Sequence, residues 1–260
     1  MIGIFDSGVG GLSVYQSIAE KLPNAPMWYV SDNGNAPYGT KSEREIRDRS
    51  FQITRFLRKK GAKIIVVACN TATTAAIDYL RDVFPDTKFI GTEPPIKTAT
   101  ELNAEHRILV LTTEATARSP RIATLIARTT IRTKNDVRIV AAPEFVDLVE
   151  QLKLWDIDAE LVARDILGPQ IDNFRPNSVV IGCTHFSFLA PLIQRVMGTY
   201  IPIFDVREGV ANQTKKLYEE LPAEDKKVKG STMFYTTGNR GNLKRFLAAA
   251  LSIESEVYEV

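Results

Sequence analysis

The chain has 260 residues, of which 44% are hydrophobic and 25% charged, and its formal net charge at pH 7 is +2. This composition is typical of a folded globular protein, and so small a charge excess argues against binding to nucleic acid or to an anionic membrane surface. Two cysteines are too few for a disulfide framework, and no apolar run approaches the roughly 18 residues that span a bilayer, so we expect reduced thiols, no signal or membrane segment and a cytoplasmic location.

Strand-like and helix-like segments alternate along the chain. The expected strands are residues 2–5, 27–30, 63–68, 88–91, 108–112, 137–141, 178–182, 201–204 and 232–236. The expected helices are residues 11–22, 42–60, 71–83, 119–129, 145–152, 159–174, 188–197, 208–220 and 239–251. Ser42 with Glu45 fits a capping box, and Asn239 fits a cap of the last helix.

Two of the expected strands are apolar throughout. KIIVVA at residues 63–68 and SVVIG at 178–182 do not alternate polar and apolar side chains, which is typical of strands in a parallel sheet covered on both faces. The alternation of strands and helices therefore predicts an α/β fold of the doubly wound type with mainly parallel sheets.

The chain also contains two loosely similar halves. Each has a buried strand that ends in a cysteine and leads directly into a helix, in VVACNTAT around Cys69 and in VVIGCTHF around Cys183. We expect one domain from residues 1–94 plus 208–260, which carries Cys69, and a second from residues 95–207, which carries Cys183.

Polar side chains occur within three residues of the ends of several expected strands. In a parallel sheet, ligands bind beyond the carboxyl ends of the strands, so these side chains are expected to share one rim or a cleft between two sheets. They are Asp6 and Ser7, Cys69, Asn70 and Thr71, Glu144, and Cys183, Thr184 and His185.

The two matched cysteines favour a chemical role. A thiol at a helix N-terminus is biased towards the thiolate, although either cysteine alone fits a small buried core residue at least as well. Inversion of a stereocentre needs a base on one face of the carbon and an acid on the other, and Cys69 and Cys183 match that need.

Each of the other candidate site residues has two possible interpretations. His185 either exchanges a proton with Cys183 or the substrate, or is satisfied in the core. Asp6 either supports Cys69 or accepts turn hydrogen bonds, and Glu144 is either a supporting carboxylate or a surface residue. The turn at Tyr38 and Gly39 either holds a carboxylate or is a connector, and His106 has no assigned role.

Several common sites are excluded by spacing. The glycines at residues 8–11 match neither a dinucleotide fingerprint nor a P-loop, and no pair of cysteines is spaced as in a redox or zinc motif. We therefore expect neither a metal nor a cofactor.

Five segments of the chain resemble the glutamate racemase family, in that family's order and approximate spacing over nearly the whole length. They are IGIFDSGVGGLSV, NAPYGTKS, VVACNTAT, VVIGCTHFSFL and FYTTG. The resemblance implies two similar α/β domains, an active site in the cleft between them, and interconversion of L- and D-glutamate for peptidoglycan synthesis, cell-wall biogenesis and cell shape. It also implies a homodimer.

The resemblance also implies residue roles. Cys69 exchanges the α-proton with D-glutamate and Cys183 with L-glutamate, and Asp6 and Glu144 support the first thiol while His185 supports the second. The implied substrate contacts are Ser7, Tyr38, Gly39, Asn70, Thr71 and Thr184.

This sequence departs from the family pattern in a few places, none of them at a proposed catalytic residue. Asn35 stands where many members have Arg, Thr73 stands where Ser is usual, and FDVR at 204–207 replaces the usual Asp-Ser-Gly. The alternatives are an aspartate or hydantoin racemase of the same superfamily, a non-catalytic binding module on this scaffold, and a Cys-His hydrolase.

Overall fold

The two cysteine-bearing halves form two compact α/β units in a computed structural model of the chain, which describes residues 1–101, 107–131, 135–226, 230 and 232–260. Unit 1 comprises Met1–Thr92 and Arg207–Val260, and unit 2 comprises Glu93–Val206. These divisions lie within two residues of the expected boundaries at 94/95 and 207/208. His106 lies outside the described residues.

Unit 1 contains a six-stranded sheet in the order β10-β9-β2-β1-β3-β4, and every strand pair in it is parallel. Its strands are β1 (Ile2–Asp6), β2 (Met27–Ser31), β3 (Ile64–Val67), β4 (Lys88–Gly91), β9 (Thr232–Thr236) and β10 (Val257–Glu259). Ile4 pairs in register with Tyr29 of β2 on one side and with Val66 of β3 on the other.

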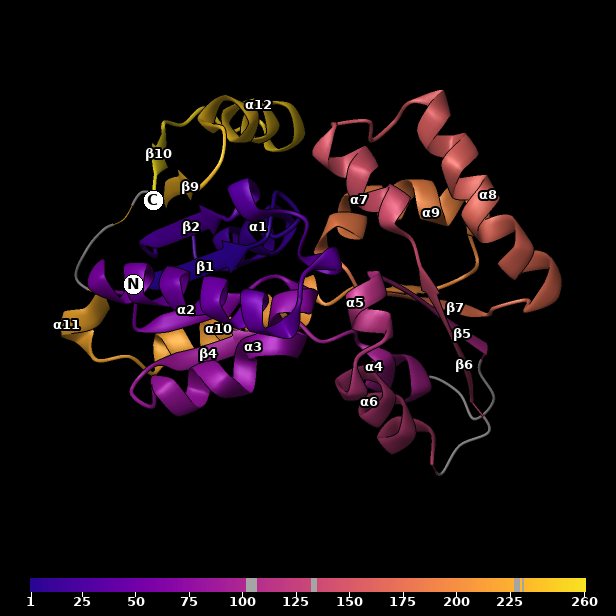
Figure 1. Cartoon of the computed structure of the whole chain (residues 1–260), viewed down its shortest axis with the longest axis horizontal. Helices are drawn as coiled ribbons and strands as arrows, with labels where there is room; N and C mark the ends of the chain where they lie inside the picture. The colour runs from indigo at the N-terminus through magenta and orange to yellow at the C-terminus, as the bar shows by residue number, and fades with distance from the viewer. Residues whose placement is uncertain (102–106, 132–134, 227–229, 231) are drawn as a thin grey trace. The chain divides into compact units, whose positions relative to one another are not determined.

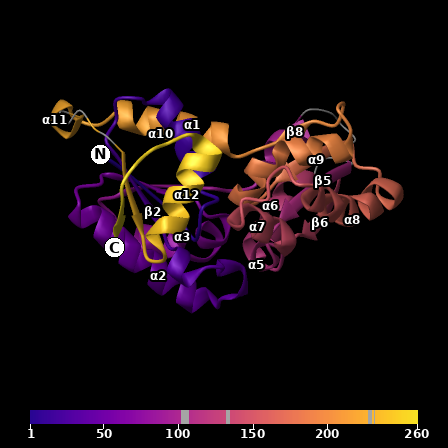
Figure 2. The ribbon, with the colours of Figure 1, turned by 90° about the horizontal axis from the view of Figure 1, so that it is seen from above.

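Helices cover both faces of this sheet. Helices α1 (Leu12–Lys21) and α10 (Arg207–Glu219) pack together on one face, while α2 (Glu43–Lys59) and α3 (Asn70–Val83) pack together on the other (Figure 2). The unit also has two short 3₁₀ helices, η1 (Asn33–Asn35) and η2 (Tyr38–Thr40), the single-turn helix α11 (Ala223–Lys226), and α12 (Arg240–Leu251), which packs against β9 and β10.

Unit 2 contains a four-stranded parallel sheet in the order β6-β5-β7-β8, of which β6, β5 and β7 are labelled in Figure 1. Its strands are β5 (Arg107–Thr112), β6 (Asp136–Ala141), β7 (Ser178–Ile181) and β8 (Ile203–Phe204). Its helices are α4 (Ile96–Glu101), α5 (Glu114–Ala117), α6 (Pro120–Thr130), α7 (Pro143–Glu150), α8 (Ile157–Asn173), the 3₁₀ helix η3 (Thr184–Leu189) and α9 (Ala190–Met197).

The two sheets share one topology. The order β2-β1-β3-β4 in unit 1 corresponds strand for strand to β6-β5-β7-β8 in unit 2. All residues of β3 and β7 are buried, as expected for continuous apolar strands with helices on both faces. The predicted fold class, two similar doubly wound α/β units with parallel sheets, is confirmed.

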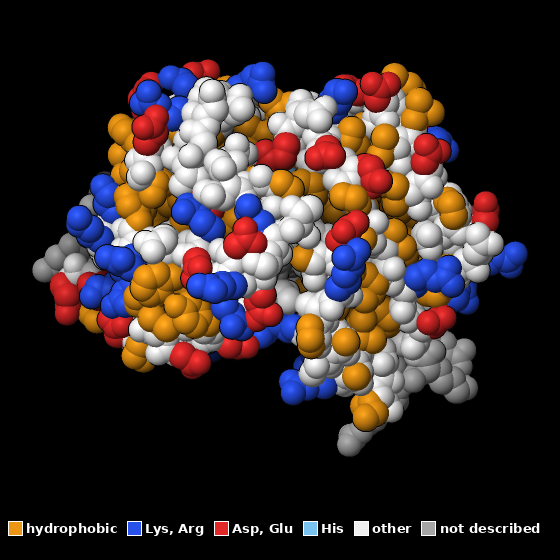
Figure 3. All heavy atoms as spheres, in the orientation of Figure 1, with side chains coloured by type: hydrophobic (Ala, Val, Ile, Leu, Met, Phe, Trp, Pro, Cys, Tyr) orange, Lys and Arg blue, Asp and Glu red, His pale blue; other side chains and the backbone are white. Residues whose placement is uncertain are grey.

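The nine expected strands and nine expected helices are present with shifts at their ends, and both predicted caps form. Ser42 and Glu45 bond reciprocally at the start of α2, and Asn239 accepts a hydrogen bond from the backbone of Asn242 at the start of α12. Several short elements in the described residues were not predicted, namely the helices α4, α5 and α11, the 3₁₀ helices η1 and η2, and the strand β10. Acidic and basic side chains are interspersed on the face shown in Figure 3, in keeping with the small net charge.

No helix within the described ranges has the length and apolar character to cross a membrane.

Candidate active site

Each sheet has a topological switch point, where connections from two neighbouring strands run to opposite sides of the sheet. In unit 1, β1 lies between β2 and β3, and in unit 2, β5 lies between β6 and β7. Ligand crevices form at such switch points, outside the carboxyl ends of the diverging strands. Cys69 comes after β3 and Cys183 comes after β7, so each cysteine lies at the switch point of its own sheet.

Cys69 begins helix α3, as the sequence predicted. Its Sγ accepts a hydrogen bond from the backbone N–H of Ala72 at 3.4 Å, which is the contact a capping side chain makes. The same sulfur lies 3.6 Å from Oγ of Ser7, just beyond the end of β1. A backbone donor and the positive end of a helix dipole both favour the thiolate, so the fold holds this side chain in a position suited to a base.

Asp6 is the last residue of β1 and is fully buried. Its Oδ2 accepts a hydrogen bond from the N–H of Gly8 at 2.8 Å, which is the turn-acceptor contact considered from the sequence. Gly11 packs directly against it, because a Cβ at position 11 would lie 2.5 Å from the Cβ of Asp6. The carboxylate is thus fixed beside Ser7, at the carboxyl end of β1.

Tyr38 and Gly39 lie in η2, and the Tyr38 side chain is buried. Its hydroxyl donates a 2.6 Å hydrogen bond to Oδ2 of Asp32. Burial, followed by the charge of Asp32 and this hydrogen bond, raises the pKa of Tyr38. The hydroxyl is therefore engaged inside the protein, and any contact of this turn with a substrate falls to its backbone.

Asp32, which sequence reasoning missed, is a buried carboxylate at the centre of a hydrogen-bond network. Besides Tyr38, it accepts from Nε and Nη2 of Arg49 at 3.0 and 2.7 Å, from Nδ2 of Asn35 at 3.0 Å and from Oγ1 of Thr237 at 2.7 Å. These donors compensate the burial of the carboxylate. Asp32 directly follows β2. The rule that ligands bind beyond the carboxyl ends of parallel strands, here called the strand-end rule, therefore also identifies it.

Asn70 and Thr71 are buried in the first turn of α3. Nδ2 of Asn70 donates to the carbonyl oxygen of Thr92 at 3.0 Å. Its Oδ1 is buried and has no hydrogen-bond partner within the described part of the chain. An unsatisfied buried acceptor costs about 1–3 kcal/mol, and a donor such as a substrate ammonium group would remove that cost.

Cys183 differs from Cys69 in the type of helix that it precedes. The sequence predicted a helix start at both, but Cys183 precedes the six-residue 3₁₀ helix η3, and α9 begins only at Ala190. The dipole argument is therefore weaker for this thiol, because α9 begins seven residues later and η3 is short. Thr184 and His185, the first two residues of η3, are both buried.

His185 lies between Cys183 and a carboxylate. Its Nδ1 lies 3.8 Å from Sγ of Cys183, and its Nε2 lies 2.8 Å from Oε1 of Glu150. Burial disfavours the imidazolium, but the hydrogen bonds to Cys183 and Glu150 and the charges of both groups outweigh it and raise the pKa of His185 well above its usual value. The imidazole is therefore positioned to exchange a proton with the Cys183 thiol.

Glu150 is a second residue that sequence reasoning missed. It is half-buried at the end of α7, where it contacts His185. Glu144, the predicted candidate, lies exposed in the first turn of the same helix. Because the strand-end rule looks only three residues beyond β6, it selects Glu144, whereas the contact of Glu150 depends on how α7 packs against η3.

The cysteines form no disulfide, and no cluster of three or more potential metal ligands occurs in the part of the chain that the structure describes. The groups assembled at each crevice are thus a thiol, hydrogen-bond donors and carboxylates. In combination, they are suited to moving protons and to binding a small charged substrate.

Comparisons with known proteins agree with this chemistry. A model of the Asp/Glu/hydantoin racemase family matches residues 2–214. A glutamate racemase of Clostridium perfringens is 38% identical over 228 residues, which cover 87% of this chain and 86% of that protein.

Solved structures give the same result for the fold. A glutamate racemase from Escherichia coli, in complex with L-glutamate and the activator UDP-MurNAc-Ala, aligns with a TM-score of 0.87 at 30% identity, covering 99% of this chain and 96% of that one. The glutamate racemase isoform RacE1 from Bacillus anthracis aligns with a TM-score of 0.88 at 25% identity, covering 100% and 97%.

Proposed function

The chain belongs to the Asp/Glu/hydantoin racemase family, and on that premise we propose that it interconverts L- and D-glutamate by proton transfer between two thiols and the α-carbon, with no cofactor. The observation that carries this proposal is the equivalence of the two cysteines. Each lies at the switch point of a sheet of the same topology, directly after the corresponding strand.

The proton steps balance without a further reactant. From L-glutamate, the thiolate of Cys183 takes the α-proton, the C–H bond breaks, and its electron pair remains on the α-carbon and the adjoining carboxylate. The thiol of Cys69 then delivers its proton to the opposite face. The enzyme is left with a Cys183 thiol and a Cys69 thiolate, which is the state that the reverse reaction from D-glutamate requires.

Neighbouring groups support both half-reactions. The N–H of Ala72 lowers the free energy of the Cys69 thiolate, and His185, held by Glu150, is positioned to exchange a proton with Cys183. We assign Asp6 and Glu144 to the first thiol's side, as the resemblance implies, and add Glu150 on the second because of its contact with His185.

The substrate contacts are assigned at the same crevices. Asn70 has a buried acceptor suited to the amino group. Hydroxyl and backbone N–H groups are suited to the two carboxylates, and we assign these contacts to Ser7, Tyr38, Gly39, Thr71 and Thr184. Since Tyr38 gives its hydroxyl to Asp32, we expect its backbone to make the contact.

The proposal extends to how the substrate binds, what the product is used for, and the location and oligomeric state of the protein. The substrate would bind with one thiol facing each side of the α-carbon. D-Glutamate made in this way would serve peptidoglycan synthesis and hence cell shape. We further propose a cytoplasmic homodimer that requires no metal, nucleic acid or membrane.

The direct test is incubation of the full chain with L-glutamate in D₂O, without added cofactor and with a metal chelator present. We expect D-glutamate with deuterium at the α-carbon. If neither D-glutamate nor α-deuterium appears, the proposal fails. Aspartate and a hydantoin are the comparison substrates, and faster turnover of either would transfer the assignment to that branch of the family.

A further inference from the structure

The turn that carries Tyr38 has little secondary structure of its own. Residues 32–42 connect β2 to α2 through the three-residue 3₁₀ helices η1 and η2. The backbone hydrogen bonds from Asn35 to Asp32 and from Lys41 to Tyr38 span only three residues each. Single 3₁₀ turns have poor hydrogen-bond geometry and are weak by themselves. The position of this turn must therefore depend on contacts with other elements.

Asp32 supplies such contacts, because its carboxylate joins three separate segments. Oδ2 accepts from the hydroxyl of Tyr38 at 2.6 Å and from Nε of Arg49 at 3.0 Å. Oδ1 accepts from Nη2 of Arg49 and from Oγ1 of Thr237, both at 2.7 Å. Arg49 belongs to α2, and Thr237 directly follows β9. The bidentate bond from Arg49 fixes the orientation of the carboxylate, so the Tyr38 hydroxyl is held relative to both elements.

Thr237 holds the same segment at a second point. Besides donating to Asp32, its Oγ1 accepts from the N–H of Gly34 in η1 at 3.2 Å. Its own N–H donates to the carbonyl oxygen of Ser31 at 3.1 Å. The two backbones are closely packed, since a Cβ on Gly34 would overlap the carbonyl oxygen of Thr237. The loop after β9 thus fastens the start of the segment that leads to Tyr38.

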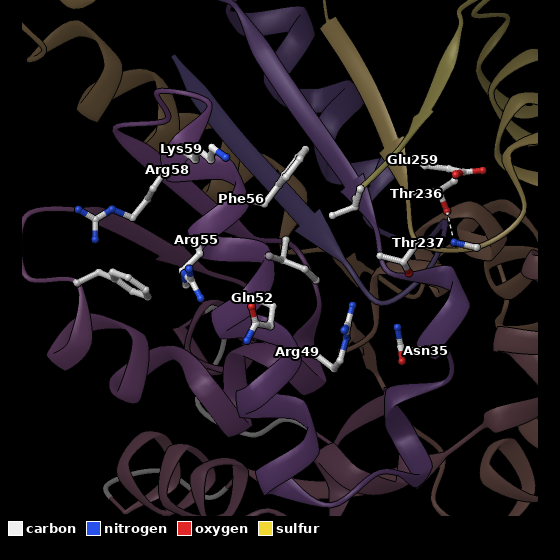
Figure 4. A pocket seen from close by; sticks show the side chains of 14 residues that line it. Asn35, Arg49, Gln52, Arg55, Phe56, Arg58, Lys59, Thr236, Thr237 and Glu259 are labelled. Atoms are coloured by element: carbon white, nitrogen blue, oxygen red, sulfur yellow. Dashed lines mark hydrogen bonds between the residues drawn. The ribbon is translucent and has the colours of Figure 1, made fainter.

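The donors of this network can be changed one at a time. Arg49, Asn35 and Thr237 gather at one end of a pocket of about 1090 Å³ that runs along α2 (Figure 4). The side chain of Arg49 is 31% exposed there. Water in the pocket can take the place of a lost donor, so a conservative substitution leaves the buried carboxylate hydrated and the core intact.

We propose that the network around Asp32, formed with Arg49 and Thr237, positions a substrate contact. It holds the turn at Tyr38 and Gly39 so that the backbone of the turn meets a carboxylate of glutamate, and the three residues act through the turn without touching the substrate. The link to glutamate rests on the proposed function, which takes this turn as a substrate contact. The holding of the turn does not.

The kinetic test separates KM from kcat. A misplaced turn weakens binding of the ground state and the transition state alike, so KM rises while kcat stays unchanged. Thr237→Val removes the hydroxyl at nearly constant shape, and Arg49→Lys keeps the charge but loses the bidentate bond. Each should raise KM for glutamate about fivefold, the loss expected for one hydrogen bond. Thr237→Ser keeps the hydroxyl and should restore the KM of the wild type.

The matched control is Arg58→Lys. Arg58 also belongs to α2 and lines the same pocket, but its ion-pair partner is Asp86, at 2.6 Å. Its substitution should leave KM unchanged. The proposal is overturned if KM is unchanged in both Thr237→Val and Arg49→Lys, if Arg58→Lys raises it equally, or if kcat falls while KM stays constant.

Hydrogen–deuterium exchange of residues 33–41, followed by mass spectrometry, tests the holding of the turn without reference to activity. Thr237→Val should speed exchange in this segment about fivefold relative to the wild type, because local opening becomes easier, and Arg58→Lys should not. Unchanged exchange in Thr237→Val would refute the holding of the turn. If the wild type racemises no glutamate, the proposed function fails, yet exchange still decides whether the network holds the turn, so the two failures are distinguishable.

Discussion

At the scale of single residues, the two thiols are supported by different means. Cys69 is held at a helix start with a backbone N–H directed at its sulfur, whereas Cys183 depends on the imidazole of His185 and, behind it, on Glu150. We therefore expect the two chemically similar groups to respond differently to substitution of their neighbours. This asymmetry is the basis of the first two predictions.

Glu150→Gln should lower the pKa of His185. The charge and the hydrogen bond of Glu150 both contribute to the raised value, and the amide removes the charge. The measurement is an NMR titration of the His185 ring, in a His106→Asn background because the chain has only two histidines. Glu144→Gln is the matched control on the same helix, and an equal shift in that variant would count against the Glu150–His185 pairing.

The same pair has a consequence for stability. Because the pKa of His185 is raised in the folded state, its contribution to the free energy of unfolding is fully present below the unfolded value of about 6.5, and is lost as the pH rises through the folded pKa. Chemical denaturation should therefore show the largest deficit of Glu150→Gln at about pH 5–6.5, and a shrinking deficit above that range. A deficit that grows with pH would contradict this sign.

Cys69→Ser and Cys183→Ser should each lower the racemisation rate by at least about 10³-fold, since an alcohol at neutral pH is a poor base in place of a thiolate. Polarimetry of D-glutamate formation measures the loss, and circular dichroism checks that each variant remains folded. Near-normal activity in either variant would rule out the two-thiol mechanism.

Most of the candidate residues that sequence reasoning found lie at or just beyond the end of a strand, the exceptions being Tyr38 and Gly39 in η2. Asp6, Cys69 and Cys183 are within two residues of a strand end, where topology alone predicts a ligand crevice. Glu150 lies nine residues beyond β6, at the far end of a helix, so only the packing of α7 brings it to His185. The commitment of the Tyr38 hydroxyl to Asp32 is likewise a tertiary contact that spacing does not reveal.

At the scale of elements, the strands and the longer helices were predictable because their signals are local. Apolar runs mark β3 and β7, and caps mark the starts of α2 and α12. Two of the missed elements have no such signal. β10 has three residues of which only Val257 is buried, and α4 spans the mixed segment IKTATE. Their formation depends on the surfaces they pack against.

Gly11→Ala should destabilise the protein by about 1–3 kcal/mol, the usual cost of overpacking. The added Cβ would lie 2.5 Å from Cβ of Asp6 and 2.9 Å from Cβ of Ala68, and neither atom can swing away because each is attached to the main chain. Gly209→Ala is the control, since that helical position is exposed with nothing within 4 Å, and it should gain about 0.5–1 kcal/mol. Urea unfolding measures both changes, and equal effects of the two variants would contradict the packing argument.

Ser42→Ala should destabilise α2 by about 1 kcal/mol, because it removes a capping box in which Glu45 and Ser42 bond reciprocally. The melting temperature should fall by about 2–4 °C in a chain of this size. Ser42→Thr retains a capping hydroxyl and should melt close to the wild type. A loss in Ser42→Thr as large as that in Ser42→Ala would show that the cap is not the cause.

At the scale of the whole molecule, one topology occurs twice and each copy supplies one thiol. The corresponding strands β3 and β7 lead to Cys69 and Cys183, and the chain passes from unit 1 to unit 2 at Thr92 and returns at Arg207. The repeated cysteine motif revealed this doubling in the sequence. The two enantiomers of an amino acid need the same kind of acid–base group on opposite faces of the α-carbon. Two similar units that each carry one thiol match that need.

The most direct test of the two-thiol account is a crystal structure of the protein with glutamate bound. The account predicts both sulfur atoms within about 3–4 Å of the α-carbon, the separation of reacting atoms, with Cys69 and Cys183 on opposite faces of it. Both sulfurs on one face, or either one remote from the bound amino acid, would contradict it.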